Sequence, residues 1–293
     1  MAAHHHHGHS ASGWLNGFIG MLIFSGSLPA TRVAVLAFEP VFLTALRATI
    51  AGVVALALLL ILQEKRPNQT QLLPLLIVSL GVVIGFPLLT ALALQYVTSA
   101  HSIVFLGLLP LTTATFGVIR GGERPRPAFW GFSIMGSLLV VGFALSQGVT
   151  ASWRGDVLML AAVVICGLGY AEGATLSRTM GGWQVICWAL VLSLPLMLLL
   201  ALGTRPDAFD HIEPPAWIAL AYVSLFSMLI GFFFWYKGLA QGGIAAVGQL
   251  QLLQPFFGLA LAAWLLREPV SSTMVLMTFA VILCVVGSKR FGR

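Results

Sequence analysis

Charged residues are scarce in this sequence. They make up 8% of the 293 residues, whereas hydrophobic residues make up 59%, and a soluble globular domain carries about 25% charged residues. A mean hydropathy of +0.98 is too high for one buried core, so most apolar side chains must lie outside it. The composition excludes a soluble enzyme and predicts an integral membrane protein whose apolar residues face lipid.

Several motifs are also missing. No GxxxxGK[ST] sequence is present, which excludes ATP hydrolysis by this chain. No Asp lies inside an apolar run, and His101 lies at the end of one, so an intramembrane protease has no basis. The three cysteines fit neither zinc spacing nor a CxxC motif and are expected as packed free thiols. The charge of +6 forms no continuous basic stripe, which speaks against nucleic acid binding.

Residues 1–13 (MAAHHHHGHSASG) resemble a purification tag and linker, and they hold five of the seven histidines. Such a segment is excluded from fold reasoning, so this histidine cluster is not interpreted as a metal site. No metal or cofactor is expected elsewhere.

Ten apolar runs are each near the roughly 20 residues that a helix needs to cross a bilayer. The predicted spans are 14–35, 40–62, 72–94, 100–119, 128–147, 157–176, 183–203, 217–236, 244–266 and 272–287. One set of loops and ends carries ten Lys and Arg residues and the other set carries four. Because basic loops stay in the cytoplasm, we expect a multi-pass protein with both termini cytoplasmic.

The two halves of the chain match at a nearly fixed offset. Pro110 matches Pro255 and Glu123 matches Glu268, 145 positions apart, and Ile84-Gly85-Phe86 matches Ile230-Gly231-Phe232 at an offset of 146. The expected repeats are 14–147 (spans 1–5) and 157–290 (spans 6–10). An odd number of spans per repeat inserts the second half upside down, as in many transporters. The alternative is an old duplication without a mechanistic role.

The sequence resembles the drug/metabolite transporter superfamily in its EamA type. The resemblance rests on the run from Pro40 to Arg47, on Pro110 followed by Gly122-Glu123, and on Leu252-Leu253-Gln254-Pro255 followed by Arg267-Glu268-Pro269. Arg267 replaces the usual Gly, and Phe24-Ser25-Gly26 stands where Trp-Gly is frequent. Within the superfamily the chain looks most like YddG-type amino-acid exporters. The resemblance implies an all-α fold of two inverted five-helix repeats around a central cavity. It also implies export of small metabolites across the bacterial inner membrane.

Four residues are predicted hinges because they recur in both halves: Gly85, Pro110, Gly231 and Pro255. A mid-span proline lacks an N–H and frees the carbonyl four residues earlier, which is Gln251 O in the case of Pro255. The alternative is a static kink.

Five residues are predicted to contact substrate. Gln251 and Gln254 share a helix face, Glu172 is an intramembrane carboxylate that could bind an ammonium group or a proton, and Tyr170 and Trp235 suit an apolar wall. For the glutamines the alternative is interhelical hydrogen bonding, for Glu172 it is an orientation toward the cytoplasmic face, where Arg178 lies, and for the two aromatic residues it is ordinary packing. Arg47, also inside a span, could hold a carboxylate or anchor the helix, and the anchoring role is favoured.

The predicted function is alternating-access export of neutral, aromatic or other apolar amino acids by a secondary transporter. Drugs or other small metabolites are the alternative cargo, and an intramembrane enzyme or a receptor is the alternative of another class. The expected partners are the small-molecule substrate and the lipid bilayer. The sequence is compatible with a monomer and leaves the oligomeric state open.

Overall fold

The computed structural model describes residues 4–97, 102, 105–146, 152–209, 212–266 and 272–292, and the regular structure among them is helical. The first half contains α1 (His4–Ser25), α2 (Ser27–Val35), α3 (Pro40–Ile61), α4 (Gln69–Val78), η1 (Ser79–Gly85), α5 (Phe86–Ala93), α7 (Leu109–Gly121) and α8 (Pro127–Ser146). The second half contains α9 (Trp153–Met180), α10 (Gly182–Gly203), α11 (Pro214–Ala221), η2 (Tyr222–Ile230), α12 (Gly231–Gly242), α13 (Ile244–Gly248), η3 (Gln249–Leu253), α14 (Gln254–Leu266) and α15 (Ser272–Phe291).

Six helical segments of the described chain are long and apolar enough to cross a membrane. They are Ala11–Val35, Pro40–Ile61, Gln69–Ala93, Trp153–Met180, Gly182–Gly203 and Pro214–Gly242, and Pro127–Phe143 is a shorter apolar helix. Large apolar side chains such as Leu60, Leu199 and Ile218 are exposed on their outer faces. A surface of this kind is stable in lipid, so the chain is a multi-pass membrane protein.

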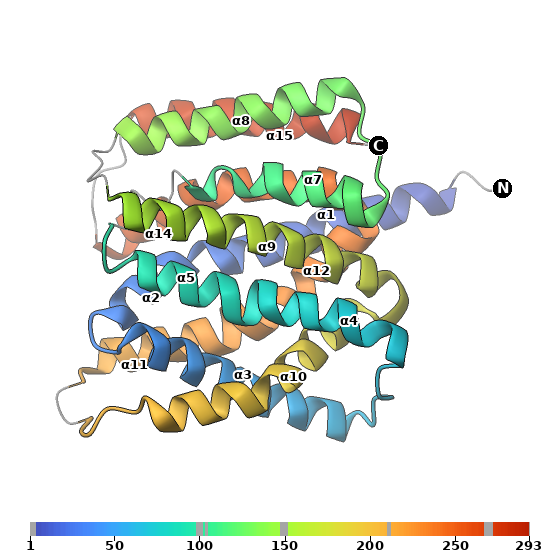
Figure 1. Ribbon diagram of the computed structural model, residues 1–293. Coiled ribbons are helices and arrows are strands. Elements are labelled where there is room, and N and C mark those ends of the chain that lie inside the picture. The colour runs from blue at the N-terminus through green and yellow to red at the C-terminus, as the bar shows by residue number, and fades with distance from the viewer. Residues whose placement is uncertain are drawn as a thin grey trace.

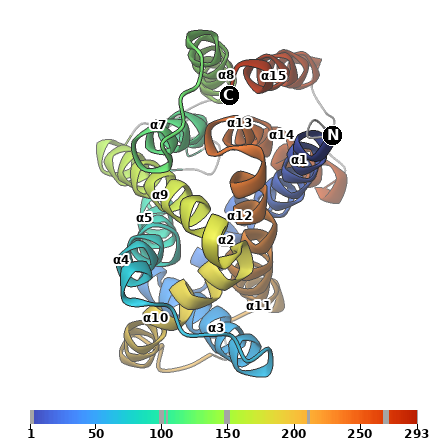
Figure 2. The ribbon, with the colours of Figure 1, turned by 90° about the vertical axis from the view of Figure 1, so that its right-hand side faces the viewer.

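The helices run side by side with their ends at two opposite sides of the bundle (Figure 1). The start of α1 and the end of α15 lie at the same side, which we call the terminal side, while α2, α5 and α11 lie toward the opposite side (Figure 1). Helices α8 and α15 pack against each other and form a separate layer above the rest of the bundle (Figure 2). Helix α9 passes through the middle and contacts α5, α7 and α12.

Glycines bring α1 and α12 close together. A Cβ added at Gly13 would lie 2.5 Å from the Gly242 nitrogen, and one added at Gly238 would meet the backbone of Gly17. Both helices therefore present glycines four residues apart, the spacing that lets helix backbones approach closely in membranes. Ser12 Oγ also donates to Gln241 Oε1 at 3.3 Å, so the contact between the two helices already begins at residue 12.

Two of the long segments contain π-helical stretches, η1 and η2. Both predicted glycine hinges lie at these stretches, with Gly85 as the last residue of η1 and Gly231 directly after η2. A Cβ added at either glycine would meet the carbonyl oxygen five residues earlier, that of Leu80 or Phe226. Since π-helical turns are frequently found at functional sites, these are suitable points for a change in helix geometry.

The two predicted proline hinges differ from the mid-helix kinks that we expected. Pro110 is the second residue of α7 and Pro255 the second residue of α14, a place where a missing N–H costs little. The helix is interrupted before each proline, and the N–H of Gln254 donates to the Gln251 carbonyl. That carbonyl is therefore not left without a donor, because the chain forms a tight 3-10 turn there.

Candidate functional site

A cavity lies in the middle of the bundle and extends toward the side opposite the termini. About 620 Å³ of space free of atoms lies within it, counting its opening. Both halves of the chain contribute. The lining residues are Phe24, Ser27, Leu28, Thr31, Arg47, Val82, Phe86, Pro87, Thr90, Leu106, Leu109, Cys166, Tyr170, Ser227, Phe232 and Gln254.

Aromatic rings form one wall of this cavity. The ring of Phe24 lies 5.0 Å from that of Phe232 and 6.5 Å, stacked, from that of Tyr170. Trp235 lies behind them, fully buried, with its ring 5.5 Å from Tyr170. Aromatic pairs at these distances attract one another, so the wall is rigid and suits an apolar group of a ligand.

Polar groups of the lining come from elements of both halves. Ser27 Oγ donates to Ser227 Oγ at 2.7 Å, and Gln254 Nε2 donates to the Phe24 carbonyl at 3.2 Å. Arg47 donates from Nη2 to the Val223 carbonyl at 3.2 Å, but its Nε meets no partner within the described part of the chain. The Thr90 hydroxyl is likewise buried without a described partner. A small polar group bound in the cavity would satisfy these atoms.

Two of the predicted contact residues line the cavity, and three do not. Tyr170 and Gln254 are in the lining. Trp235 and Gln251 are buried deeper, and neither amide atom of Gln251 has a hydrogen-bond partner among the described residues. Neither residue is part of the cavity lining.

Glu172 lies outside the cavity and has a partner. Its Oε2 accepts from Arg120 Nε at 2.7 Å and its Oε1 accepts from Arg120 Nη2 at 3.0 Å. The Glu172 side chain is 6% exposed and that of Arg120 is 44% exposed, so the pair bridges the interior and the terminal side. The hydrogen bond to Glu172 raises the pKa of Arg120. Glu172 therefore points toward the terminal side, and its partner is Arg120 of α7 and not Arg178.

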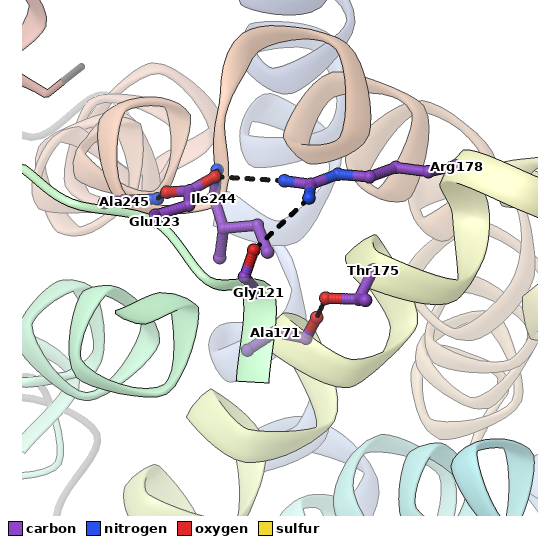
Figure 3. Close-up of polar contacts among 7 residues, drawn as sticks. All are labelled: Gly121, Glu123, Ala171, Thr175, Arg178, Ile244 and Ala245. Carbon is purple, nitrogen blue, oxygen red and sulfur yellow. Dashed lines mark hydrogen bonds and ion pairs between the residues drawn. The ribbon is translucent and has the colours of Figure 1, made fainter. Parts of the chain in front are cut away.

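A second polar cluster at the terminal side joins the two halves. Glu123 accepts hydrogen bonds from the backbone N–H groups of Ile244, at 2.6 Å, and Ala245, at 2.8 Å, and from Arg178 Nη2 at 3.2 Å (Figure 3). Arg178 also donates from Nη1 to the Gly121 carbonyl at 3.4 Å. We call these five residues the Glu123 cluster.

The backbone around the Glu123 cluster explains how it forms. Gly122 adopts a φ of 67° after the end of α7, and Gly243 adopts a φ of 98° just before α13. Both values are in the region that favours glycine, and together they turn the carboxylate toward the free N–H groups of α13. Charged acceptors bind such N–H groups strongly. The sequence signal was present as the repeat match at Glu123, but it did not identify the partners.

Comparisons with known proteins agree with this architecture. The profile of the EamA-like transporter family matches twice, at residues 11–146 and 153–288. The chain is 66% identical over 284 residues to the uncharacterized transporter YdeK of Bacillus subtilis (strain 168), covering 97% of this chain and 99% of that protein. It is 24% identical over 241 residues to the uncharacterized transporter YyaM of the same organism, covering 77% of each.

A solved crystal structure shares the fold. The two superimpose with a TM-score of 0.78 at 21% sequence identity, covering 94% of this chain and 98% of the other. At this identity the likeness concerns the fold alone. The two family matches and the close relative together show that this multi-pass membrane protein belongs to the EamA-like transporter family.

Proposed function

We propose that this chain is a secondary transporter that exports small metabolites, namely amino acids with neutral apolar or aromatic side chains, across the bacterial inner membrane. One observation carries the proposal: a cavity with an aromatic wall and unsatisfied polar groups lies between the two halves. The relatives named as transporters support the class of function. A ligand with an apolar side chain and charged ends fits such a lining.

The proposed topology has ten crossings in two inverted repeats. Helix packing supports it, because an inverted repeat pairs each contact with an equivalent one. The α1–α12 contact corresponds to the α9–α5 contact. The α3–α10 and α8–α15 contacts each join one helix to its equivalent in the other half. The two π-helices and the two helix-starting prolines also recur in equivalent places. Such repeats typically give transporters two access states.

In alternating access, the protein would close the side of the cavity that is now open and open the side that is now closed. With cytoplasmic termini, the cavity described here opens outward, and the Glu172–Arg120 pair and the Glu123 cluster close the cytoplasmic side. Opening inward requires both groups of bonds to separate, which would bring Trp235 and Gln251 to the pathway. The glycines at η1 and η2 and the prolines of α7 and α14 are the proposed hinges.

The alternative cargo, cationic drugs, is disfavoured by the lining. Its charged residue is Arg47, and no Asp or Glu is found among the described lining residues. An intramembrane enzyme or a receptor would leave substrate on its original side of the membrane. Directional movement of an unmodified solute therefore discriminates the transporter from both.

Transport by purified protein in liposomes tests the proposal. Vesicles loaded with unlabelled leucine, phenylalanine or methionine should accumulate the labelled form by exchange, and imposing a pH gradient tells uniport from proton antiport. Lysine and glutamate serve as charged comparison solutes, and protein-free vesicles serve as the blank. Failure of exchange with every neutral amino acid of the panel would remove the amino-acid assignment.

A further inference from the structure

Arg47 brings a positive charge to the cavity, and no ion pair of Arg47 is found among the described residues. The residue is 7% exposed, and Nη2 is its one nitrogen with a described hydrogen bond, to the Val223 carbonyl. Each ion pair found among the described residues involves another arginine, Arg120 or Arg178. An arginine does not lose its proton in a protein, and a buried charge without a partner is costly. An anionic group of a solute in the cavity would offset this cost.

We propose that Arg47 binds the carboxylate of the transported solute, so the cavity selects organic acids and amino acids by that group. The bond to the Val223 carbonyl uses one of the two hydrogens on Nη2 of Arg47, and Nε carries a hydrogen without a described partner. Nε–H and an Nη2–H lie on the same edge of the planar guanidinium. Guanidinium groups bind carboxylates through two parallel bonds of this kind. The proposal deepens the function proposed above and replaces the interpretation of Arg47 as a structural anchor.

Other polar groups of the lining suit a solute whose carboxylate faces Arg47. The Thr90 hydroxyl, buried and without a described partner, also lines the cavity and can donate to a carboxylate oxygen. An ammonium group would find uncharged acceptors, the Ser27 and Ser227 hydroxyls and the Gln254 side-chain oxygen. The apolar body of the solute would then lie against Phe24, Tyr170 and Phe232. Since the acceptors for the ammonium are neutral, the carboxylate is the group on which recognition depends.

The test compares acids with their amides in the purified protein. Thermal stabilisation in detergent is measured with phenylalanine, phenylalanine amide, phenylpyruvate and phenethylamine, and the same compounds compete for exchange in liposomes. Phenylalanine and phenylpyruvate, which keep the carboxylate, should stabilise and compete. The amide and the amine should be weaker by about tenfold to a hundredfold, the loss expected for hydrogen bonds to a charged group.

Variants assign the effect to the residue. Arg47→Gln should lose the preference for acids, Arg47→Lys should keep part of it, and Thr90→Val, which preserves shape, should reduce it less. Arg205→Gln is the matched control because Arg205 is an exposed arginine in the loop after α10. If Arg47→Gln does not fold, Thr90→Val and the acid and amide series still decide the matter.

The outcomes separate this proposal from the proposed function. Binding of phenylpyruvate without exchange of any amino acid supports carboxylate recognition and removes the amino-acid assignment. Amino-acid exchange that amides inhibit as well as acids do, or an acid preference unchanged in Arg47→Gln, overturns carboxylate recognition while leaving the transporter in place. Absence of stabilisation by every acid also overturns it.

Discussion

The carboxylate of Glu172 and the guanidinium of Arg120 meet through two parallel hydrogen bonds of 2.7 Å and 3.0 Å. The two residues differ in burial, with side chains 6% and 44% exposed respectively. Removing one partner therefore has unequal consequences. A carboxylate left alone in the interior costs more than an arginine left alone at a surface where water reaches it.

This asymmetry predicts the behaviour of a double-mutant cycle. Arg120→Gln should destabilise the protein by about 1–3 kcal/mol, since Glu172 loses its charged partner. Glu172→Gln should cost less, and the double variant should recover most of the loss of Arg120→Gln. Thermal unfolding in detergent provides the measurement. Equal losses in the two single variants would contradict the unequal burial.

The Glu123 cluster should hold the terminal side closed. Glu123→Gln keeps the shape but removes the charge that strengthens three hydrogen bonds, so opening on that side should become more frequent. A cysteine introduced at Ala245, which is fully buried, should then react faster with a thiol reagent added from the terminal side. The native cysteines are buried free thiols and are replaced by alanine beforehand.

Glu39→Gln is the control for the Glu123 prediction. Glu39 also caps a helix, accepting from the Phe42 N–H at 2.9 Å, but it belongs to α3 and lies outside the Glu123 cluster. Its substitution should leave the labelling of Ala245→Cys unchanged. Similar labelling in the Glu39 and Glu123 variants would mean that general loosening, and not loss of the cluster, exposes position 245.

Membrane topology is predicted by the Lys and Arg distribution. Single cysteines at Asp207 and at Arg124 should react with impermeant thiol reagents from opposite sides of the membrane, with Asp207 outside. Both positions are exposed in loops, so access to reagent does not depend on opening. Labelling of both from one side would contradict the inverted repeat.

The helical membrane fold was predictable because it depends on properties that sequence carries directly. Apolar runs of the length of a bilayer predicted the six long helical segments, and the free cysteines and EamA-type family were also predicted correctly. Ten spans and their inversion stay predictions, since residues 98–101, 147–151 and 267–271 lie outside the described residues.

The site was predicted only in part. Tyr170 and Gln254 line the cavity, and so does Arg47, for which an anchoring role was favoured above, whereas the contacts of Glu123 were missed. Helix periodicity shows which residues are buried, but which of them face a common cavity depends on where helices break. The end of α1 before Gly26 and the π-helical turns of η1 and η2 set those directions. The contact between Glu123 and Ile244 joins residues 121 positions apart, and spacing along the sequence cannot reveal it.

The helix-starting prolines should matter for transport more than for folding. Pro110→Ala and Pro255→Ala restore an N–H and allow a helix to continue through a point where it is now interrupted. A continuous helix would favour one access state. Exchange should then slow by about tenfold for each 1.4 kcal/mol by which the balance between the two states shifts. Pro127→Ala, at the exposed start of α8, is the control. Unchanged exchange in both hinge variants would reduce these prolines to static breaks.

The cavity wall should determine which side chains are carried. Tyr170→Ala removes a ring that contacts Phe24, Phe232 and Trp235, and Gln254→Leu removes the hydrogen bond to the Phe24 carbonyl. The first change enlarges the space beside the aromatic wall, so it should shift preference toward bulkier side chains. The second should weaken all amino acids alike, because it alters a polar group and leaves the wall intact. Exchange competition among alanine, leucine, phenylalanine and tryptophan measures both effects, with Arg205→Ala as the surface control. If Tyr170→Ala kept the original order of preference while Arg205→Ala changed it, the selecting site would lie away from this cavity.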